Sequence, residues 1–186
     1  MFYTIFVKTI YLIRHSGPFV EIENYTNEKV LWSEFNRNMI LSLLGEINAQ
    51  KLCNVKELKG LSAIYVSNSA RAIGTAKYLA ELNDLKIKLD ARINERELGV
   101  NYLQDLPADF TKHSFDDKNF KLPHGESLNQ VDIRFKSFIN NCLDSDSNRI
   151  AIVMHGNILL SYLATITKQF NFDGKNFDIK FNDRII

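Results

Sequence analysis

Short apolar runs recur along the chain, each bounded by polar or turn-forming residues. Three of them are rich in β-branched and aromatic residues, which is typical of strands buried on both faces. The clearest strand predictions are 7–15 ("VKTIYLIRH"), 61–67 ("LSAIYVS") and 149–155 ("RIAIVMH"). The alternating segment 85–90 ("LKIKLD") predicts a further strand, and 177–181 ("FDIKF") predicts a short final one.

Between these runs, apolar residues recur three or four positions apart, which indicates helices with one buried face. The pattern predicts helices at 41–52, 69–82, 127–143 and 157–167. The third of these is the most regular, with apolar side chains at Leu128, Val131, Phe135, Phe138 and Cys142. The first places Leu41, Leu44, Asn48 and Leu52 on one helical face, and Ser42 is positioned to cap its start.

Strands that alternate with helices favour a layered α/β fold with a largely parallel sheet. The chain has 186 residues, 45% of them hydrophobic, which suits a single domain spanning residues 1–186. Two stretches, 18–40 and 100–125, show neither periodicity. Loops of that length in a compact domain are usually functional or mobile, so we expect them to carry the parts that recognise the substrate.

Charge and cysteine content narrow the class of protein. The 23 basic and 22 acidic residues give a net charge of +1, which indicates neither a nucleic-acid partner nor a membrane surface. No apolar run reaches the roughly 18 residues of a membrane helix, and the N-terminus lacks a cleavage site for export. Cys53 and Cys142 show no metal-ligand spacing. These features predict a cytoplasmic protein with no disulfide framework and no metal site.

Two predicted strands end in the same way. The first runs into Arg14 and His15, and a later one ends at His155, directly before Gly156. Ligands bind outside the carboxyl ends of parallel strands, so the two histidines can face one another there. Arg71 near the start of one helix, and a helix beginning after His155, would both attract an anion. Together these residues predict a phosphate-binding pocket, although each alone also suits a structural or surface role.

Six short motifs then resemble those of the histidine phosphatase superfamily, which has the phosphoglycerate-mutase-like fold. In chain order they are 12–16 ("LIRHS"), 41–49 ("LSLLGEINA"), 66–76 ("VSNSARAIGTA"), 93–99 ("INERELG"), 123–127 ("PHGES") and 153–157 ("VMHGN"). Each motif by itself is a weak signal, whereas six in the same order and at plausible spacing are a strong one for the fold.

The resemblance implies a three-layer α/β/α sandwich with a mostly parallel central sheet. It also implies a phosphomonoester phosphatase that acts through a phosphohistidine on a small phosphorylated metabolite, with no cofactor. In that assignment His15 is the nucleophile and Glu95 the proton donor, and the phosphate ligands are Arg14, Arg71 and His155. Arg96 and Gly156 are implied as possible substrate contacts.

The chemistry of phosphoryl transfer agrees with these roles. An imidazole can attack phosphorus when one ring nitrogen carries no proton, and a backbone carbonyl bonded to the other nitrogen fixes that tautomer. Forked guanidinium groups at Arg14 and Arg71 suit the negative charge of the transition state. A protonated His155 would add a third cation. The cationic pocket is expected to lower the pKa of His15 and keep it unprotonated.

Five points stay open at the level of sequence. Glu97 is a rival to Glu95 as the proton donor, since both would lie on one side of an extended segment. Ser16, Pro18 and Glu21 depart from the superfamily pattern, and these changes bear on the substrate and on the rate. A mutase-like phosphotransferase and a non-catalytic phosphate-binding module of the same fold remain alternatives. The neighbouring aromatic residues Trp32 and Phe35 offer either an apolar wall for a substrate or simple packing, and nothing indicates the oligomeric state.

Overall fold

The computed structural model describes residues 7–20, 30–167, 169–172 and 177–180. In chain order its elements are β1 (Thr9–Arg14), α2 (Trp32–Asn38), α3 (Leu43–Lys51), η1 (Leu52–Asn54), η2 (Lys56–Leu58), β2 (Ala63–Val66), α4 (Ala70–Leu82), β3 (Ile87–Leu89), η3 (Ala91–Ile93), η4 (Leu103–Asp105), α5 (Phe110–Asp116), α6 (Leu128–Asp144), β4 (Arg149–Met154), α7 (Gly156–Ile166), β5 (Gln169–Phe172) and β6 (Phe177–Lys180).

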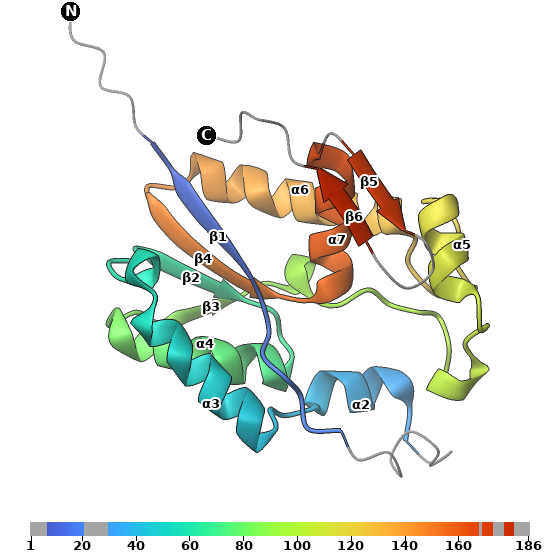
Figure 1. Cartoon of the computed structure of the whole chain (residues 1–186), viewed down its shortest axis with the longest axis horizontal. Coiled ribbons are helices and arrows are strands. Elements are labelled where there is room, and N and C mark those ends of the chain that lie inside the picture. Colours follow the sequence, from blue (N-terminus) through green and yellow to red (C-terminus); the bar gives the residue numbers. More distant parts are fainter. Residues whose placement is uncertain (1–6, 21–29, 168, 173–176, 181–186) are drawn as a thin grey trace, which may run out of the picture.

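Four strands form one parallel sheet in the order β1-β4-β2-β3 (Figure 1). β4 lies between β1 and β2, so the two strands predicted to end at the pocket are direct neighbours. Their register pairs Arg14 with Met154, which aligns the carboxyl ends of the two strands. β5 and β6 form a separate antiparallel ribbon. The prediction of an α/β fold with a mostly parallel sheet is confirmed.

Helices cover both faces of this sheet, with α3 and α4 on one side and α6 and α7 on the other (Figure 1). Successive side chains of β4 alternate between two apolar cores, as strand geometry requires. Ile150, Ile152 and Met154 pack with the Phe135 and Phe138 side of α6. On the opposite face, Ala151 and Val153 pack with residues of α4. The three-layer sandwich is therefore confirmed.

The predicted face of the 41–52 helix, which is present as α3, is half right: Leu41 is buried and Leu52 packs against the core, whereas Leu44 and Asn48 are exposed. Ser42 caps it, accepting a hydrogen bond from the Gly45 N–H at 3.0 Å. Leu44 is 65% exposed, whereas Gly45 and Ala49 are buried. The reason is a close approach: a Cβ added at Gly45 would lie 2.0 Å from the Gly17 carbonyl oxygen. The smallest residues of the helix, not its leucines, pack against the loop that follows β1.

Two short helices lie in the stretches that showed no periodicity. α2 and α5 have seven residues each, and neither begins at a residue whose side chain caps the helix. No residue of α2 is buried, so no apolar stripe marks it in the sequence. β5, which pairs with the predicted β6, was also not predicted.

Cys53 and Cys142 are both free thiols, and only Cys142 is fully buried. No helix within the described ranges has the length and apolar character to cross a membrane. The assignment of residues 1–186 to one domain stays a prediction.

Candidate active site

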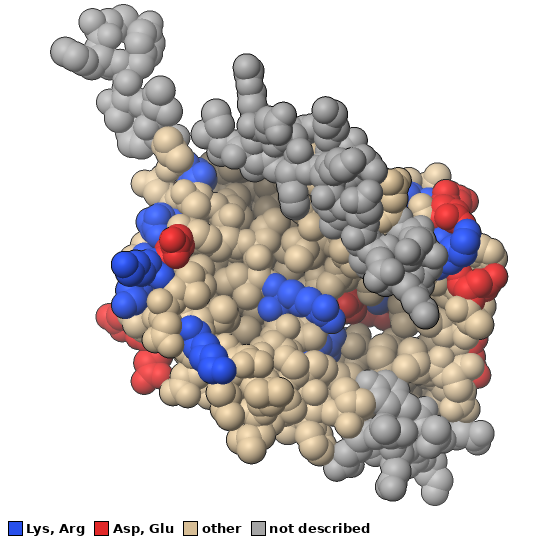
Figure 2. Space-filling model, viewed as in Figure 1, with Lys and Arg blue, Asp and Glu red and all other residues tan. Residues whose placement is uncertain are grey.

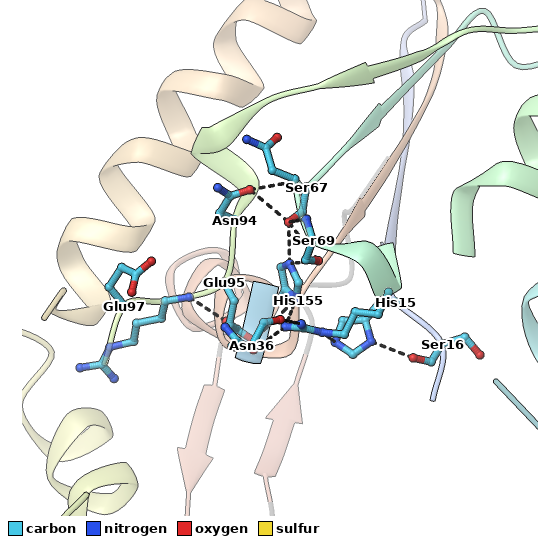
Figure 3. A network of polar contacts seen from close by, with 12 residues as sticks. His15, Ser16, Asn36, Ser67, Ser69, Asn94, Glu95, Glu97 and His155 are labelled. Carbon is cyan, nitrogen blue, oxygen red and sulfur yellow. Dashed lines mark hydrogen bonds and ion pairs between the residues drawn. The ribbon is translucent and has the colours of Figure 1, made fainter. Parts of the chain in front are cut away.

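The two histidines meet at the carboxyl ends of β1 and β4. The His15 backbone N–H donates to the carbonyl of Met154, the last residue of β4, at 2.9 Å, which continues the parallel ladder one residue past β1. The two imidazole rings meet edge to face, with centroids 5.1 Å apart (Figure 3). Neighbouring parallel strands thus hold both rings on rigid backbone, which is the placement that a reacting side chain needs.

A fixed tautomer of His15 follows from its two partners. Nδ1 lies 2.8 Å from the Ser16 carbonyl oxygen, and a carbonyl can only accept, so Nδ1 carries the proton. Nε2 accepts from the Arg71 Nε–H at 3.0 Å. Burial above all, together with the charges of Arg71 and Arg14, lowers the pKa of His15 to about 4 against the opposing effect of the hydrogen bond to the Ser16 carbonyl. His15 is therefore neutral near pH 7, with its unprotonated nitrogen directed into the site.

His155 is completely buried and is also neutral. Its Nδ1 lies 3.0 Å from Arg71 Nη2, a group that can only donate. Its Nε2 lies 2.7 Å from the Ser67 hydroxyl, which in turn donates to Asn94 Oδ1 at 3.1 Å. Burial first, then the charge of Arg71, lowers the pKa of His155 to about 2. His155 is therefore not protonated in this arrangement and does not supply the third positive charge of the pocket.

Arg71 joins the two histidines to α2. It lies in the first turn of α4, where the helix places its buried side chain across the ends of β1 and β4. Besides its bonds to His15 and His155, it donates through Nη1 to the Asn36 carbonyl and through Nη2 to Asn36 Oδ1, the latter at 2.9 Å. Two oxygens of Asn36 thus contact the guanidinium that sequence analysis assigned to phosphate.

Arg14, the last residue of β1, lies beside Gly156, the first residue of α7. A Cβ added at Gly156 would come within 3.5 Å of Arg14 Nε and 3.6 Å of its Cζ. These are ordinary contact distances, so the exposed Arg14 guanidinium lies directly beside the first residue of α7, at a helix N-terminus where an anion is favoured. Figure 2 shows basic side chains bordering a hollow near the centre of this face.

Glu95 and Glu97 occupy different environments. The Glu95 carboxylate accepts from the Arg96 backbone N–H at 2.9 Å and lies 4.0 Å from His155 Nδ1, with 16% of its side chain exposed. Burial raises the pKa of Glu95, against the opposing effects of the Arg96 N–H, of Arg71 and of a hydrogen bond from Asn157. Glu97 is exposed and is held through its backbone: its N–H donates to Glu126 Oε2 at 3.1 Å, and its carbonyl accepts from the Glu126 N–H at 2.8 Å.

Two glycines allow the backbone of the Glu95 loop to pack closely against the turn at 123–127. Gly99 has a φ of +82°, and a Cβ there would lie 2.5 Å from the Pro123 carbonyl. A Cβ at Gly125 would lie 2.8 Å from the Leu98 carbonyl. Arg134 on α6 binds Glu126 through Nε at 2.8 Å and the Arg92 carbonyl through Nη1 at 2.6 Å. The backbone around Glu95 is thus fixed from both sides.

Arg96, a possible substrate contact by sequence, is buried with its guanidinium held by the protein. Nε donates to the Glu126 carbonyl at 2.7 Å and Nη2 to the Phe120 carbonyl at 3.2 Å. Its Cζ lies 4.8 Å from the centre of the Phe110 ring. Burial lowers the pKa of Arg96 to about 10. These contacts favour a structural role for the guanidinium, although other atoms of Arg96 line the cavity beside His15.

Comparison with known proteins identifies the family. A profile described as the histidine phosphatase superfamily (branch 1) matches residues 10–183. The chain belongs to the histidine phosphatase superfamily. The match includes both strand ends, Arg71 and the Glu95 loop, so the resemblance seen in the six motifs is confirmed.

Relatives within this superfamily carry names of both phosphatases and mutases. A protein of Hydrogenobacter thermophilus, provisionally named phosphoserine phosphatase 2, is 24% identical over 87% of this chain and 79% of its own length. A protein of Erwinia tasmaniensis, provisionally named phosphoglycerate mutase GpmB, is 26% identical over 84% of this chain and 74% of its own. The mycobacterial glucosyl-3-phosphoglycerate phosphatase Rv2419c has the same fold, with a TM-score of 0.67 at 22% identity over 85% of this chain and 78% of its own.

Three residues that follow β1 depart from the superfamily signature, namely Ser16, Pro18 and Glu21. Ser16, in place of the usual glycine, donates from its hydroxyl to the Gly45 carbonyl at 2.8 Å and from its backbone N–H to Thr75 Oγ1 at 2.9 Å. Pro18 lines the cavity beside His15 and pairs with Leu41 in an isolated bridge. Glu21 lies outside the described residues.

Sequence reasoning missed the polar residues that hold the histidines in this superfamily member. Asn36 lies in the unassigned stretch 18–40, on a helix with no periodic signal. Ser69 lies 3.3 Å from His155 Nε2, on the side shared with Ser67 and Asn94 (Figure 3). Ser67, Ser69 and Asn94 all lie inside the matching motifs, so their spacing from Arg71 and Glu95 was the available signal.

Proposed function

We propose that this protein is a phosphomonoester phosphatase in which His15 accepts the phosphoryl group. The observation that carries the proposal is the tautomer of His15, because its Nδ1 is held by the Ser16 carbonyl and its Nε2 has an unshared pair inside the site. A neutral imidazole on a strand end is a competent nucleophile. The names of several relatives as phosphatases agree with this proposal.

The reaction proceeds in two balanced steps. Nε2 of His15 forms a bond to phosphorus as the bond from phosphorus to the leaving oxygen breaks, and the Glu95 carboxyl gives its proton to that oxygen. Water then attacks the phosphohistidine, Glu95 takes the proton of the water, and the N–P bond breaks to release phosphate. Arg14 and Arg71 stabilise the charge on the phosphoryl oxygens. The raised pKa of Glu95 supports its role as the acid, in preference to the exposed Glu97.

Hydrolysis is favoured over the mutase alternative by the segment that follows Gly99. A mutase keeps its phosphoenzyme from water, which usually takes a substantial lid. Between Gly99 and Pro123 the chain forms only the short helices η4 and α5. This segment offers little structure that is able to close over His15.

The test is turnover of 4-nitrophenyl phosphate by wild type, His15→Ala and, as a matched control, His113→Ala at an exposed position on α5. We expect His15→Ala to lose at least about a thousandfold in kcat/KM, a loss typical of removing a nucleophile, and the control to keep wild-type activity. An acid-labile, base-stable phosphoprotein should form in wild type and in His113→Ala but not in His15→Ala. Equal activity in wild type and His15→Ala would contradict the proposal, and binding of phosphate without turnover would favour the non-catalytic module.

A further inference from the structure

A cavity of about 210 Å³ lies beside His15 and is partly apolar. Its apolar lining comes from three segments, namely the turn after β1, the region of α2 and the loop that follows Glu95. The side chains concerned are Pro18, Trp32, Met39 and Leu98. Because His15 and Arg71 line the same cavity, a phosphoryl group held by them would leave the rest of its substrate among these apolar groups.

The cations of this cavity are already engaged by the reacting end or by the protein. Among its described lining residues, Arg71 contacts both histidines, and the Arg96 guanidinium donates to two carbonyls. Glu95 brings a carboxyl group, and Asn157 a neutral amide. A carboxylate on the leaving group would therefore enter a partly apolar space in which the described lining residues offer it no uncommitted cation, and an unpaired charge taken out of water is costly.

The size of the cavity limits the leaving group as well. Drug-sized ligands typically occupy pockets of roughly 300–1,000 Å³, so a cavity of about 210 Å³ is suited to a smaller group. Trp32, which lines the cavity, has a second aromatic ring beside it, that of Phe35, with the two ring centroids 6.1 Å apart. Aromatic side chains favour a ring partner in edge-to-face or offset contact.

We propose that the preferred substrate is a phosphomonoester of an uncharged alcohol that carries one aromatic ring, with Trp32 and Leu98 as specificity-determining residues. This inference rests on the proposed function of the same site. It separates the chain from an enzyme for phosphoglycerates, whose leaving group carries a carboxylate. Benzyl phosphate and 3-phosphoglycerate are both esters of primary alcohols, so they compare the two kinds of leaving group fairly.

The kinetic experiment compares kcat/KM for benzyl phosphate, glycerol 1-phosphate and 3-phosphoglycerate. Wild type should prefer benzyl phosphate to 3-phosphoglycerate by at least about tenfold, since small apolar pockets discriminate by roughly 10–200-fold. Trp32→Ala should lose about tenfold on benzyl phosphate and change little on glycerol 1-phosphate. Leu31→Ala is the matched control, because Leu31 is an exposed apolar residue directly before α2 and does not line the cavity. Equal losses on both esters in Trp32→Ala would overturn the inference.

A binding experiment separates this inference from the proposed function. Benzylphosphonate and 3-phosphonopropionate cannot be hydrolysed, so calorimetry measures their affinities in wild type without turnover. Tighter binding of benzylphosphonate, lost in Trp32→Ala, supports the inference even when no ester is hydrolysed, an outcome in which the hydrolytic function alone fails. Equal or tighter binding of 3-phosphonopropionate overturns the inference, and hydrolysis that depends on His15 leaves the proposed function intact.

Discussion

Replacing His155 with glutamine tests whether a neutral imidazole is buried at the centre of the site. In the folded protein His155 has no exposed surface, and burial together with Arg71 lowers its pKa to about 2. In the unfolded chain its pKa returns to about 6.5. Below that pH the unfolded state binds a proton that the folded state does not bind. The sign is therefore fixed: this histidine lowers the free energy of unfolding as the pH falls below 6.5.

The magnitude follows from one proton. Well below pH 6.5 the loss approaches about 1.4 kcal/mol per pH unit. Integrated from pH 7.5 to pH 5.0, a single histidine that stays neutral in the fold removes about 2 kcal/mol. This figure requires only that the folded pKa lie well below 5, so it does not depend on the value of about 2 itself. His15, with a pKa lowered to about 4, adds a contribution of the same sign in wild type and in the variant.

The assay is urea unfolding followed by circular dichroism at several pH values between 5.0 and 7.5. Wild type should lose about 2 kcal/mol more than His155→Gln across this range, because the titrations of the other groups largely cancel in the comparison. His113→Gln makes the same substitution on α5, outside the site, and serves as the control. Parallel stability curves for wild type and His155→Gln would refute the neutral, buried His155 on which the geometry of the site depends.

Two further predictions concern α3 and α2. Gly45→Ala should destabilise the protein by about 2 kcal/mol through overpacking, because its Cβ would meet the Gly17 carbonyl oxygen at 2.0 Å, while Gly17→Ala, whose Cβ meets only ordinary contacts, is the control in the same urea titration. Asn36→Ala removes one acceptor from Arg71, so inorganic phosphate should inhibit turnover at a concentration about fivefold lower, as expected for losing a competing charge-assisted bond; Asn38→Ala on the same helix should leave that inhibition constant unchanged.

The sequence predicted the elements that have long or strongly apolar patterns. β1, β2 and β4 are short runs of apolar residues, and α6 repeats its apolar face over 17 residues. The pattern located the helix α3 but misplaced part of its buried face, because close backbone contact at Gly45, and not apolar area, decides which side of the helix is buried there. It also failed on α2, which buries no residue and so has no periodic pattern to find.

For the site, too, the sequence located the residues but did not fix all of their protonation states. His15, Arg71, Glu95 and His155 follow strands or begin helices that the pattern locates, so parallel topology is enough to bring them to one edge of the sheet. Their protonation states are a different matter, because these depend on burial and on which atoms meet across the fold. The sequence anticipated a neutral His15, but it left open a charged His155 that the structure does not favour.

The contacts between Arg71 and Asn36 explain which acceptors bind the Arg71 guanidinium when no substrate is bound. Arg71 donates to the unprotonated nitrogens of both histidines, and the two Asn36 oxygens accept from the same guanidinium. A phosphoryl group that reaches His15 must therefore exchange its own oxygens for those of Asn36 and draw Arg71 away from Nε2. Phosphate oxygens are charged acceptors and the Asn36 oxygens are neutral, so in the proposed reaction the exchange favours the phosphoryl group and frees Nε2 of His15 as the anion binds.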